Sequence, residues 1–331
     1  MNHDRLDIGD SSAVGQARRR AADLATDSGF GDTDVGRISL IVTEVATNLV
    51  KHAGGGEILL RAAKDTRGNT IDVLALDSGP GIADITAALR DGFSSAGSTG
   101  TGLGAIARTA SLFECYSRAP GGTAVFARVS SAPGPAEPGL LVDGVNVAYP
   151  GEVVSGDTWA VQHRAGKATV LIADGLGHGP FAHEAASAAA RAFDSEPSGS
   201  PAKALERIHA ALRPTRGAAV AIAEVDAGRG IVRFAGLGNI AGTIVADGAT
   251  RSVVSHHGTA GHDARRIQEF TYPWSAGARL VLHSDGLLTH WTLDTHPGLL
   301  AKHPALAAAV LYRDFRRGRD DTTVVVVKGA A

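Results

Sequence analysis

Two groups of side chains, one in each half of the chain, have types and spacings suited to chemistry on phosphate groups. In the first half, Glu44, Asn48 and His52 follow one another at intervals of four residues. This spacing places them on one face of a single helix. An acid and an amide one turn apart suit a Mg²⁺ ion on phosphate oxygens, with a base beside it. Taken alone, the pattern is more typical of an exposed polar helix face.

Two glycine-containing motifs follow in the same half. Asp77-Ser78-Gly79-Pro80-Gly81 comes directly after an apolar run. A carboxylate there can accept a hydrogen bond from an exocyclic amine, and Gly79 and Gly81 let the backbone approach a flat base. The second motif opens a helix, where free N–H groups and the helix dipole favour phosphate. Its residues are Gly97, Ser98, Thr99, Gly100, Thr101, Gly102, Leu103 and Gly104. A glycine-rich run alone is often a flexible loop, but three motifs in this order predict a nucleotide site.

Four aspartates in the second half stand at the ends of apolar runs or in tight turns. They are Asp157, Asp174, Asp285 and Asp320. Aspartate–glycine pairs are common turns, but the apolar runs beside these acids predict that they lie at the edge of a core. Hard oxygen ligands from several strand ends suit Mg²⁺ or Mn²⁺, not zinc. A pair of such ions can share a water and lower its pKa for attack on phosphorus.

The histidines of the second half do not predict a zinc site. None of them has the paired i, i+4 spacing with an intervening acid, so surface or packing roles are expected; they are His178, His183, His256, His257, His262 and His283. His178, in the glycine-rich turn after Asp174, is the candidate proton donor. The single cysteine, Cys115, lies in an apolar run and is expected to be a buried thiol.

The elements that would position these residues suggest two α+β domains joined by a linker. Three prolines and two glycines between Ser130 and Gly139 break any apolar periodicity, so we expect domains at 1–129 and 143–331 with a linker at 130–142. Apolar periodicity predicts the following helices and strands. The helices are 14–26, 32–52, 82–91, 103–112, 180–193 and 201–212. The strands are 57–63, 70–76, 122–129, 144–149, 158–163, 168–173, 218–225, 231–235, 278–283 and 322–327.

Composition narrows the class of protein. The 331 residues, 44% hydrophobic and 20% charged, are typical of globular domains. A formal net charge of −2 argues against a partner that is nucleic acid or an anionic membrane. No apolar run approaches the roughly 18 residues needed to span a bilayer, and the polar amino terminus has no signal-peptide pattern. With one cysteine and no possible internal disulfide, we expect a cytoplasmic protein.

The first half resembles the GHKL-type ATPase fold shared by gyrase, sensor histidine kinases and MutL. Glu44 to Asn48, Asp77 to Gly81 and Gly100 to Gly104 match its boxes, and the context Gly92 to Gly97 is similar to the small RsbT-type serine kinases. The resemblance covers about residues 5 to 129. It implies Asp77 on adenine, Asn48 on Mg²⁺, Glu44 as the base for a serine hydroxyl and the glycine-rich segment as a phosphate lid.

The second half resembles the PPM-type metal-dependent serine/threonine phosphatases, in the short form of the SpoIIE and RsbX group. The resemblance covers about residues 143 to 328 and implies a β-sandwich flanked by helices. It implies that Asp174 bridges two metals and that Gly175 offers its carbonyl. Asp285 and Asp320 would complete one ion, with Asp157 close by; Asp321 ranks lower because many relatives carry asparagine there. Gly236 to Ile240 is also similar to an RsbX-type turn, but no arginine matches the phosphate-gripping residue of larger members.

Together the two resemblances imply a fusion of a serine kinase and a phosphatase that uses ATP and Mg²⁺ or Mn²⁺. Its expected partners are STAS-domain antagonist or scaffold proteins of a stress-response switch. Two alternatives stay open: the first domain could bind and sequester a partner without turnover, or it could sense ATP and regulate the phosphatase.

Overall fold

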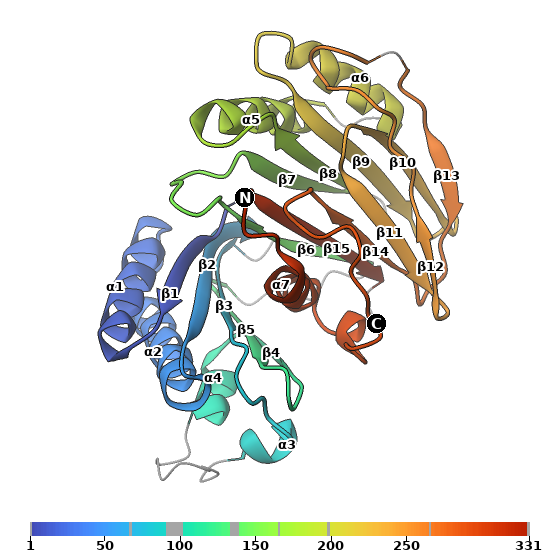
Figure 1. Cartoon of the computed structure of the whole chain (residues 1–331). Coiled ribbons are helices and arrows are strands. Elements are labelled where there is room, and N and C mark those ends of the chain that lie inside the picture. The colour runs from blue at the N-terminus through green and yellow to red at the C-terminus, as the bar shows by residue number, and fades with distance from the viewer. Residues whose placement is uncertain are drawn as a thin grey trace. The chain divides into compact units, whose positions relative to one another are not determined.

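A computed structural model describes residues 2–65, 68–90, 102–132, 139–164, 166–196, 199–264 and 266–329. The chain divides into two compact units. The N-terminal unit is His3–Ala136, and the C-terminal unit is Glu137–Ala331 together with Met1–Asn2. Each unit has a sheet-and-helix architecture of its own (Figure 1).

The N-terminal unit is one antiparallel sheet with helices on a face. Its strand order is β1-β2-β3-β5-β4, and every neighbouring pair is antiparallel. The strands are β1 Asp4–Ile8, β2 Gly56–Asp65, β3 Gly68–Leu76, β4 Leu112–Ser117 and β5 Thr123–Ser130. The helices are α1 Ser11–Asp27, α2 Asp32–Asn48, α3 Ile85–Ala88 and α4 Gly102–Thr109, and a π-helical turn, Leu49–Ala53, continues α2.

The pattern of small and branched residues explains how α1 and α2 pack. Asp10 caps α1 by accepting hydrogen bonds from the amides of Ser12 and Ala13. The buried residues of α1 are alanines at positions 17, 21 and 25, and their small side chains permit a close approach of the neighbouring helix. Helix α2 contributes larger apolar residues to the same core, namely Ile38, Ile41, Val42 and Val45. This core holds α2, and with it Asn48, against the sheet.

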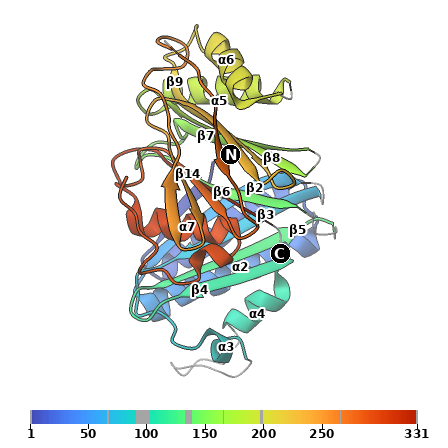
Figure 2. The ribbon, with the colours of Figure 1, turned by 90° about the vertical axis from the view of Figure 1, so that its right-hand side faces the viewer.

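The C-terminal unit is a sandwich of two five-stranded antiparallel sheets (Figures 1 and 2). The strand orders are β13-β10-β9-β8-β7 and β12-β11-β14-β15-β6. The first sheet contains β7 Asp157–Arg164, β8 Lys167–Gly175, β9 Ala218–Asp226, β10 Ile231–Leu237 and β13 Phe270–Pro273. The second contains β6 Leu140–Val147, β11 Ala241–Ala246, β12 Ala249–Ser252, β14 Arg279–His283 and β15 Thr322–Gly329.

Helices cover both outer faces of this sandwich. Helices α5 Pro180–Asp194 and α6 Pro201–Ala211 pack on the first sheet, and α7 Pro304–Phe315 packs on β6 and β15 of the second. A short 3-10 turn, Leu299–Ala301, precedes α7. The core between the sheets takes alternate residues of each strand, and the intervening residues of the first sheet pack under α5 and α6. The α+β class and the helix-flanked β-sandwich expected from the sequence are thus confirmed.

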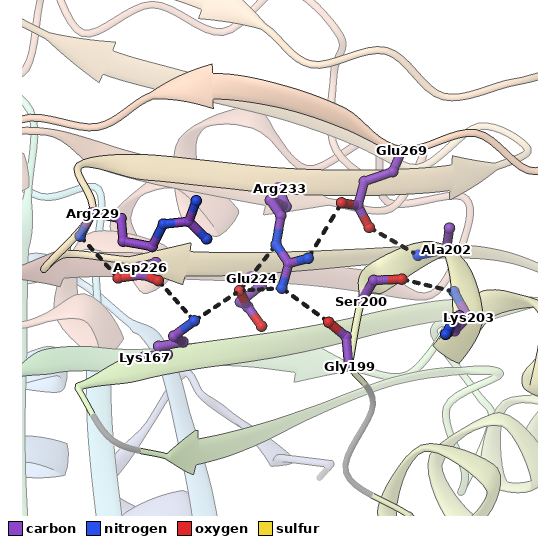
Figure 3. Close-up of polar contacts among 10 residues, drawn as sticks. All are labelled: Lys167, Gly199, Ser200, Ala202, Lys203, Glu224, Asp226, Arg229, Arg233 and Glu269. Carbon is purple, nitrogen blue, oxygen red and sulfur yellow. Dashed lines mark hydrogen bonds and ion pairs between the residues drawn. The ribbon is translucent and has the colours of Figure 1, made fainter.

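Charged side chains continue the outer face of the first sheet beyond the helices (Figure 3). Arg233 donates to the carboxylate of Glu224 over 2.6 Å, and it lies 3.5 Å from Glu269. Lys167 lies 2.7 Å from Asp226 and 3.8 Å from Glu224. By the alternation of β9, Glu224 follows Val220 and Ile222, which pack under the helices. Ion pairs therefore cover the part of this face that α5 and α6 leave free.

Several elements differ from the sequence-based expectation. The helix expected at 82–91 is only the single turn α3, and the helix expected at 103–112 ends at Thr109, where an apolar stretch becomes strand β4. A short apolar run has no period that separates helix from strand, which explains the second error. Strands β1, β11, β12 and β13 were not expected. Helix α7 was missed because it is apolar on nearly all sides and shows no amphipathic period.

Among the described helices, none is both long enough and apolar enough to cross a membrane.

Candidate functional site

The N-terminal unit contains a cavity of about 440 Å³, a size typical of small-ligand pockets. The end of α2 and the π-helical turn form one wall with Asn48, His52 and Ala53. The loop after β3, the start of α4 and strand β5 form the rest. Their lining residues include Asp77, Gly81, Gly102, Leu103 and Thr123. The three predicted motifs therefore meet at one cavity, as far as the described residues show.

Asp77 is held in place by two backbone amides. Its Oδ1 accepts hydrogen bonds from the amide of Gly79 over 2.8 Å and from that of Thr123 over 3.1 Å. The first bond closes the turn after β3, and the second joins this turn to β5. Ser117 extends the connection, since its hydroxyl accepts from the amide of Ile82 over 2.7 Å. Thr123 and Ser117 were missed because strand pairing, not local spacing, brings them here.

Gly79 and Gly81 permit close backbone contacts at this cavity. Gly81 has a φ of +76°, and a Cβ there would lie 2.1 Å from the carbonyl oxygen of Arg118. A Cβ on Gly79 would lie 2.8 Å from the Cα of Ala53. Any side chain would push the Asp77 loop away from the π-helical turn. The glycines therefore shape the wall of the cavity.

Asn48 faces the first turn of α4. A Cβ on Gly102 would lie 3.2 Å from the Oδ1 of Asn48, so the amide and the start of the helix border the same space. Gly104 is buried in α4. Glu44 lies one turn before Asn48 on α2 and is not among the described residues that line the cavity. Gly100 and Thr101, and the rest of the predicted lid before them, lie outside the described residues.

In the C-terminal unit, strand pairing brings the predicted acids to one end of the sandwich. Asp157 begins β7 directly opposite Asp174 at the end of β8. Asp285 follows β14, and Asp320 precedes β15, which pairs with β14. Each of the other three carboxylates interacts electrostatically with Asp174. Two sheets that pack face to face thus present their acids at the same edge.

Asp157 is the most buried of these acids. It is 3% exposed, and its Oδ2 accepts a 2.6 Å hydrogen bond from the hydroxyl of Ser284. The Ser284 hydroxyl in turn accepts from the amide of Thr323 over 2.9 Å, and Asn146 donates to the backbone carbonyl of Asp157. Burial raises the pKa of Asp157 to about 7, although the Ser284 bond opposes the shift. Ser284 was missed, and its only sequence signal is its position directly before Asp285.

The pKa values of the neighbouring acids are raised as well. Burial raises the pKa of Asp174 well above its usual range, and the charges of Asp157, Asp285 and Asp320 raise it further. Burial also raises the pKa values of Asp320 and Asp321. Within the described chain, no lysine or arginine forms an ion pair with Asp157, Asp174, Asp285 or Asp320. Among the described residues, these four carboxylates therefore have no lysine or arginine partner.

The oxygen donors of these acids are of the type that a hard divalent cation prefers, but the side chains do not stand close enough together to hold one. In the part of the chain that the structure describes, no three histidine, cysteine, aspartate or glutamate side chains are already spaced to hold a metal ion. Mutual repulsion between carboxylates opposes closer spacing, and a bound cation would offset it. The donors are all oxygen atoms, which Mg²⁺ and Mn²⁺ prefer, and a bound cation would lower the raised pKa values of these carboxyls. The residues that would hold the ions are Asp157, Asp174, Asp285, Asp320 and the Gly175 carbonyl.

Two further contacts stabilise the loops around the centre. Asp285 accepts a 2.6 Å hydrogen bond from the side-chain amide of Asn239, in the turn after β10. Asp321 accepts from the amide of Tyr149 over 2.8 Å, so it anchors the loop that follows β6. A Cβ on Gly175 would lie 2.1 Å from the carbonyl oxygen of Ala182. Only glycine therefore permits the first turn of α5 to lie this close to the end of β8.

His178 lies on the exposed side of this end of the sandwich. It is 60% exposed at its side chain, its Nδ1 is 2.8 Å from Glu152 Oε1, and its ring stacks on Tyr149 at 5.1 Å between centroids. A carboxylate at Nδ1 orients the imidazole ring. His183 bonds the carbonyl of Ser155, and His283 bonds that of Ser284. These two have packing roles.

Comparison with known proteins assigns each half of the chain to a family. The model of the histidine kinase-like ATPase domain matches residues 9–129, and that of stage II sporulation protein E (SpoIIE) matches residues 164–329. The chain belongs to both families. The N-terminal unit is an ATPase-family domain, and the C-terminal unit is a SpoIIE-family domain, so the fusion expected from the sequence is confirmed.

Individual relatives support the same two family assignments. The serine/threonine-protein kinase RsbT of Bacillus subtilis (strain 168) is 36% identical over 109 residues, which are 33% of this chain and 82% of RsbT. A structure described as "The bacterial stressosome: a modular system that has been adapted to control secondary messenger signaling" is 27% identical with a TM-score of 0.53, and the match covers 57% of this chain and 99% of that one. RsbX in complex with magnesium is 18% identical with a TM-score of 0.51, covering 59% and 98%, and shares the fold.

Proposed function

We propose that this SpoIIE-family chain is a bifunctional regulator of a partner-switching stress pathway. Its C-terminal unit hydrolyses phosphoserine or phosphothreonine with a two-metal site, and its N-terminal unit transfers phosphate from ATP to serine or threonine. The substrates of both units are STAS-domain proteins. The observation that carries the proposal is that Asp157, Asp174, Asp285 and Asp320 meet at one edge of the sandwich. No described lysine or arginine forms an ion pair with them there.

The chain's own residues have distinct roles in hydrolysis. Bound divalent ions would supply an activated water at neutral pH. Ser284 holds the carboxylate of Asp157 in orientation, and Asn239 does the same for Asp285. His178, whose Nδ1 lies 2.8 Å from Glu152 Oε1, would give a proton from Nε2 to the departing serine oxygen. Gly175 keeps the first turn of α5 close to the end of β8.

The N-terminal cavity supports adenine nucleotide binding. Asp77, fixed by the amides of Gly79 and Thr123, would accept from the exocyclic amine of adenine. Asn48 beside the start of α4 would hold Mg²⁺ on the phosphates, close to the helix N-terminus. Glu44, one turn before Asn48 on α2, would take the proton of the attacking hydroxyl. The 36% identity to the kinase RsbT supports transfer to a protein.

The stress-pathway assignment rests on the relatives. The kinase RsbT and the stressosome structure support a place in a stressosome-type pathway, and a STAS-domain partner is the class of substrate that we propose for it. Opposing activities in one chain would let the same partner be phosphorylated or dephosphorylated, depending on which unit it meets.

The first test is transfer of labelled phosphate from ATP to a panel of purified STAS-domain proteins, with wild type, Glu44→Ala and Asp174→Ala. We expect label to accumulate with Asp174→Ala, because removal is blocked, and to be absent with Glu44→Ala. Asp23→Ala, which removes an exposed acid of α1, is the matched control and should behave as wild type. If ATP binds and phosphoserine is hydrolysed while no protein is labelled, the N-terminal unit binds or senses its ligand without turnover.

A further inference from the structure

Three loops meet beside the acidic end of the C-terminal sandwich. The amide of Leu176 donates to the carbonyl of Gly217 over 3.0 Å, which joins the loop after β8 to the loop before β9. The amide of Gly175 donates to the carbonyl of Gly156, which joins the same loop to the one before β7. These hydrogen bonds hold the three loops close to Asp174.

Two large apolar side chains are exposed on this rim. Leu176, two residues after Asp174, is 47% exposed, and Phe181, in the first turn of α5, is 59% exposed. Their neighbour Ala182 is fully buried, so the helix turns its small residue inward and its aromatic residue outward. Exposed apolar groups that adjoin a reactive centre are typical of surfaces that bind a partner.

Arg216 supplies a cation at the same place. Its guanidinium carbon lies 4.5 Å from the centroid of the Phe181 ring, a distance at which the ring face attracts a cation. Its Nη1 would lie 3.6 Å from a Cβ on Gly177, in the loop that carries Asp174. Among the described residues, no carboxylate forms an ion pair with Arg216. The guanidinium is therefore available to an anion that arrives from solvent.

Charge explains why a cation is needed here. A phosphate that approaches Asp157, Asp174, Asp285 and Asp320 meets carboxylates that repel it until bound metal offsets their charge. A guanidinium at the rim attracts the phosphate and gives it a bidentate partner. Arg216 lies outside the motifs singled out from the sequence, so local spacing gave no reason to place it near the aspartates.

We propose that Leu176, Phe181 and Arg216 form a docking surface for the phosphorylated protein substrate. Its occupant is a segment with a phosphoserine or phosphothreonine and an apolar side chain close to it in sequence. The apolar side chain packs on Leu176 and Phe181 while Arg216 binds the phosphate. This inference rests on the proposed phosphatase function.

The probes are p-nitrophenyl phosphate and two synthetic phosphoserine peptides, which differ only in having leucine or glycine on either side of the phosphoserine. Wild type with Mn²⁺ should prefer the leucine peptide. In Phe181→Ser, the ratio of kcat/KM for the leucine peptide to kcat/KM for the glycine peptide should fall about tenfold, because an aromatic contact residue is lost. Phe181→Leu, which keeps an apolar side chain, should retain most of it.

Arg216→Ala should raise KM about tenfold for all three substrates while kcat changes little, because a charge-assisted bond in the bound state is lost. Arg216→Lys should recover part of the loss. Arg229→Ala is the matched control, because Arg229 is an exposed arginine beyond the opposite end of β9, and it should behave as wild type.

The outcomes separate the two proposals. If wild type hydrolyses none of the three probes, the phosphatase function fails, and the docking surface falls with it. If wild type hydrolyses them without preferring leucine, or Phe181→Ser keeps the preference, the docking surface is wrong and the phosphatase stands. A fall in kcat with unchanged KM in Arg216→Ala would also contradict the proposed docking surface, because that result indicates a distorted metal centre.

Discussion

At the scale of single residues, Asp157 links the chemistry of the C-terminal site to the stability of its fold. Burial raises its pKa from 3.8 to about 7. Between these two values the folded protein keeps a proton that the unfolded chain releases. The stabilising contribution of the Asp157 carboxyl to the free energy of unfolding is therefore fully present below pH 3.8 and is lost as the pH rises to about 7.

We therefore expect the free energy of unfolding of the metal-free protein to fall between about pH 4 and pH 7, with Asp157 contributing about 2 kcal/mol or more of the fall. Asp157→Asn keeps an oxygen for the Ser284 bond but cannot ionise, so it should flatten this slope. Urea unfolding followed by tryptophan fluorescence measures the effect. The three tryptophans, Trp159, Trp274 and Trp291, all lie in the C-terminal unit.

Divalent metal provides the check on this interpretation. Saturating Mg²⁺ or Mn²⁺ should stabilise wild type most at neutral pH, because ionised carboxylates bind it and protonated ones do not. Equal pH slopes for wild type and Asp157→Asn would show that burial of this carboxyl does not control the stability of the unit.

At the scale of elements, the first sheet of the sandwich has an outer face covered in two ways. Near the acidic end, α5 and α6 cover it with apolar residues. At the other end, Glu224, Arg233 and Lys167 cover it with ion pairs, and Glu269 accepts weakly from the first turn of α6 (Figure 3). The carboxylate of Glu224 is nearly buried, so its loss leaves Arg233 with a weaker partner.

Glu224→Gln should lower the free energy of unfolding by about 1–3 kcal/mol, because a largely buried cation loses its closest carboxylate. Glu196→Gln is the matched control: Glu196 is 72% exposed and 3.9 Å from Arg207, so its loss should cost under about 0.5 kcal/mol. Urea unfolding of the two variants compares them. Equal effects would mean that the network of Figure 3 contributes no more than a surface pair.

At the scale of the whole molecule, each predicted site is built from one unit alone. Glu44, Asn48 and Asp77 lie within His3–Ala136, and the acids from Asp157 to Asp320 lie within Glu137–Ala331. The two proposed activities should therefore be separable between molecules.

Complementation in trans tests this separation. An equimolar mixture of Glu44→Ala and Asp174→Asn should sustain ATP hydrolysis in the presence of a phosphorylatable STAS-domain protein, because one variant adds the phosphate and the other removes it. Neither variant alone should sustain it beyond one phosphorylation of the substrate. Release of inorganic phosphate over time measures the cycle. A mixture that stays inactive, while each variant keeps its own half-reaction, would show that both sites must be in one chain.

The local patterns of the sequence predicted most of the elements that carry the sites. Helix α2, strands β3, β8 and β14 and the acids at strand ends followed from periodicity and turn residues, because these depend on neighbours a few positions away. Strands β11, β12 and β13 and helix α7 did not, since short or uniformly apolar segments carry no distinguishing period.

Residue type and local spacing identified the candidate side chains: an acid, an amide and glycines for a nucleotide, and aspartates at strand ends for a divalent metal. The residues that support these side chains are brought to them by the three-dimensional fold. Ser284 bonds Asp157 across 127 positions, and Tyr149 bonds Asp321 across 172. Arg216 likewise reaches the rim through the pairing of β8 with β9. Spacing along the chain determines which residues share a face, but strand pairing and sheet packing determine which faces meet.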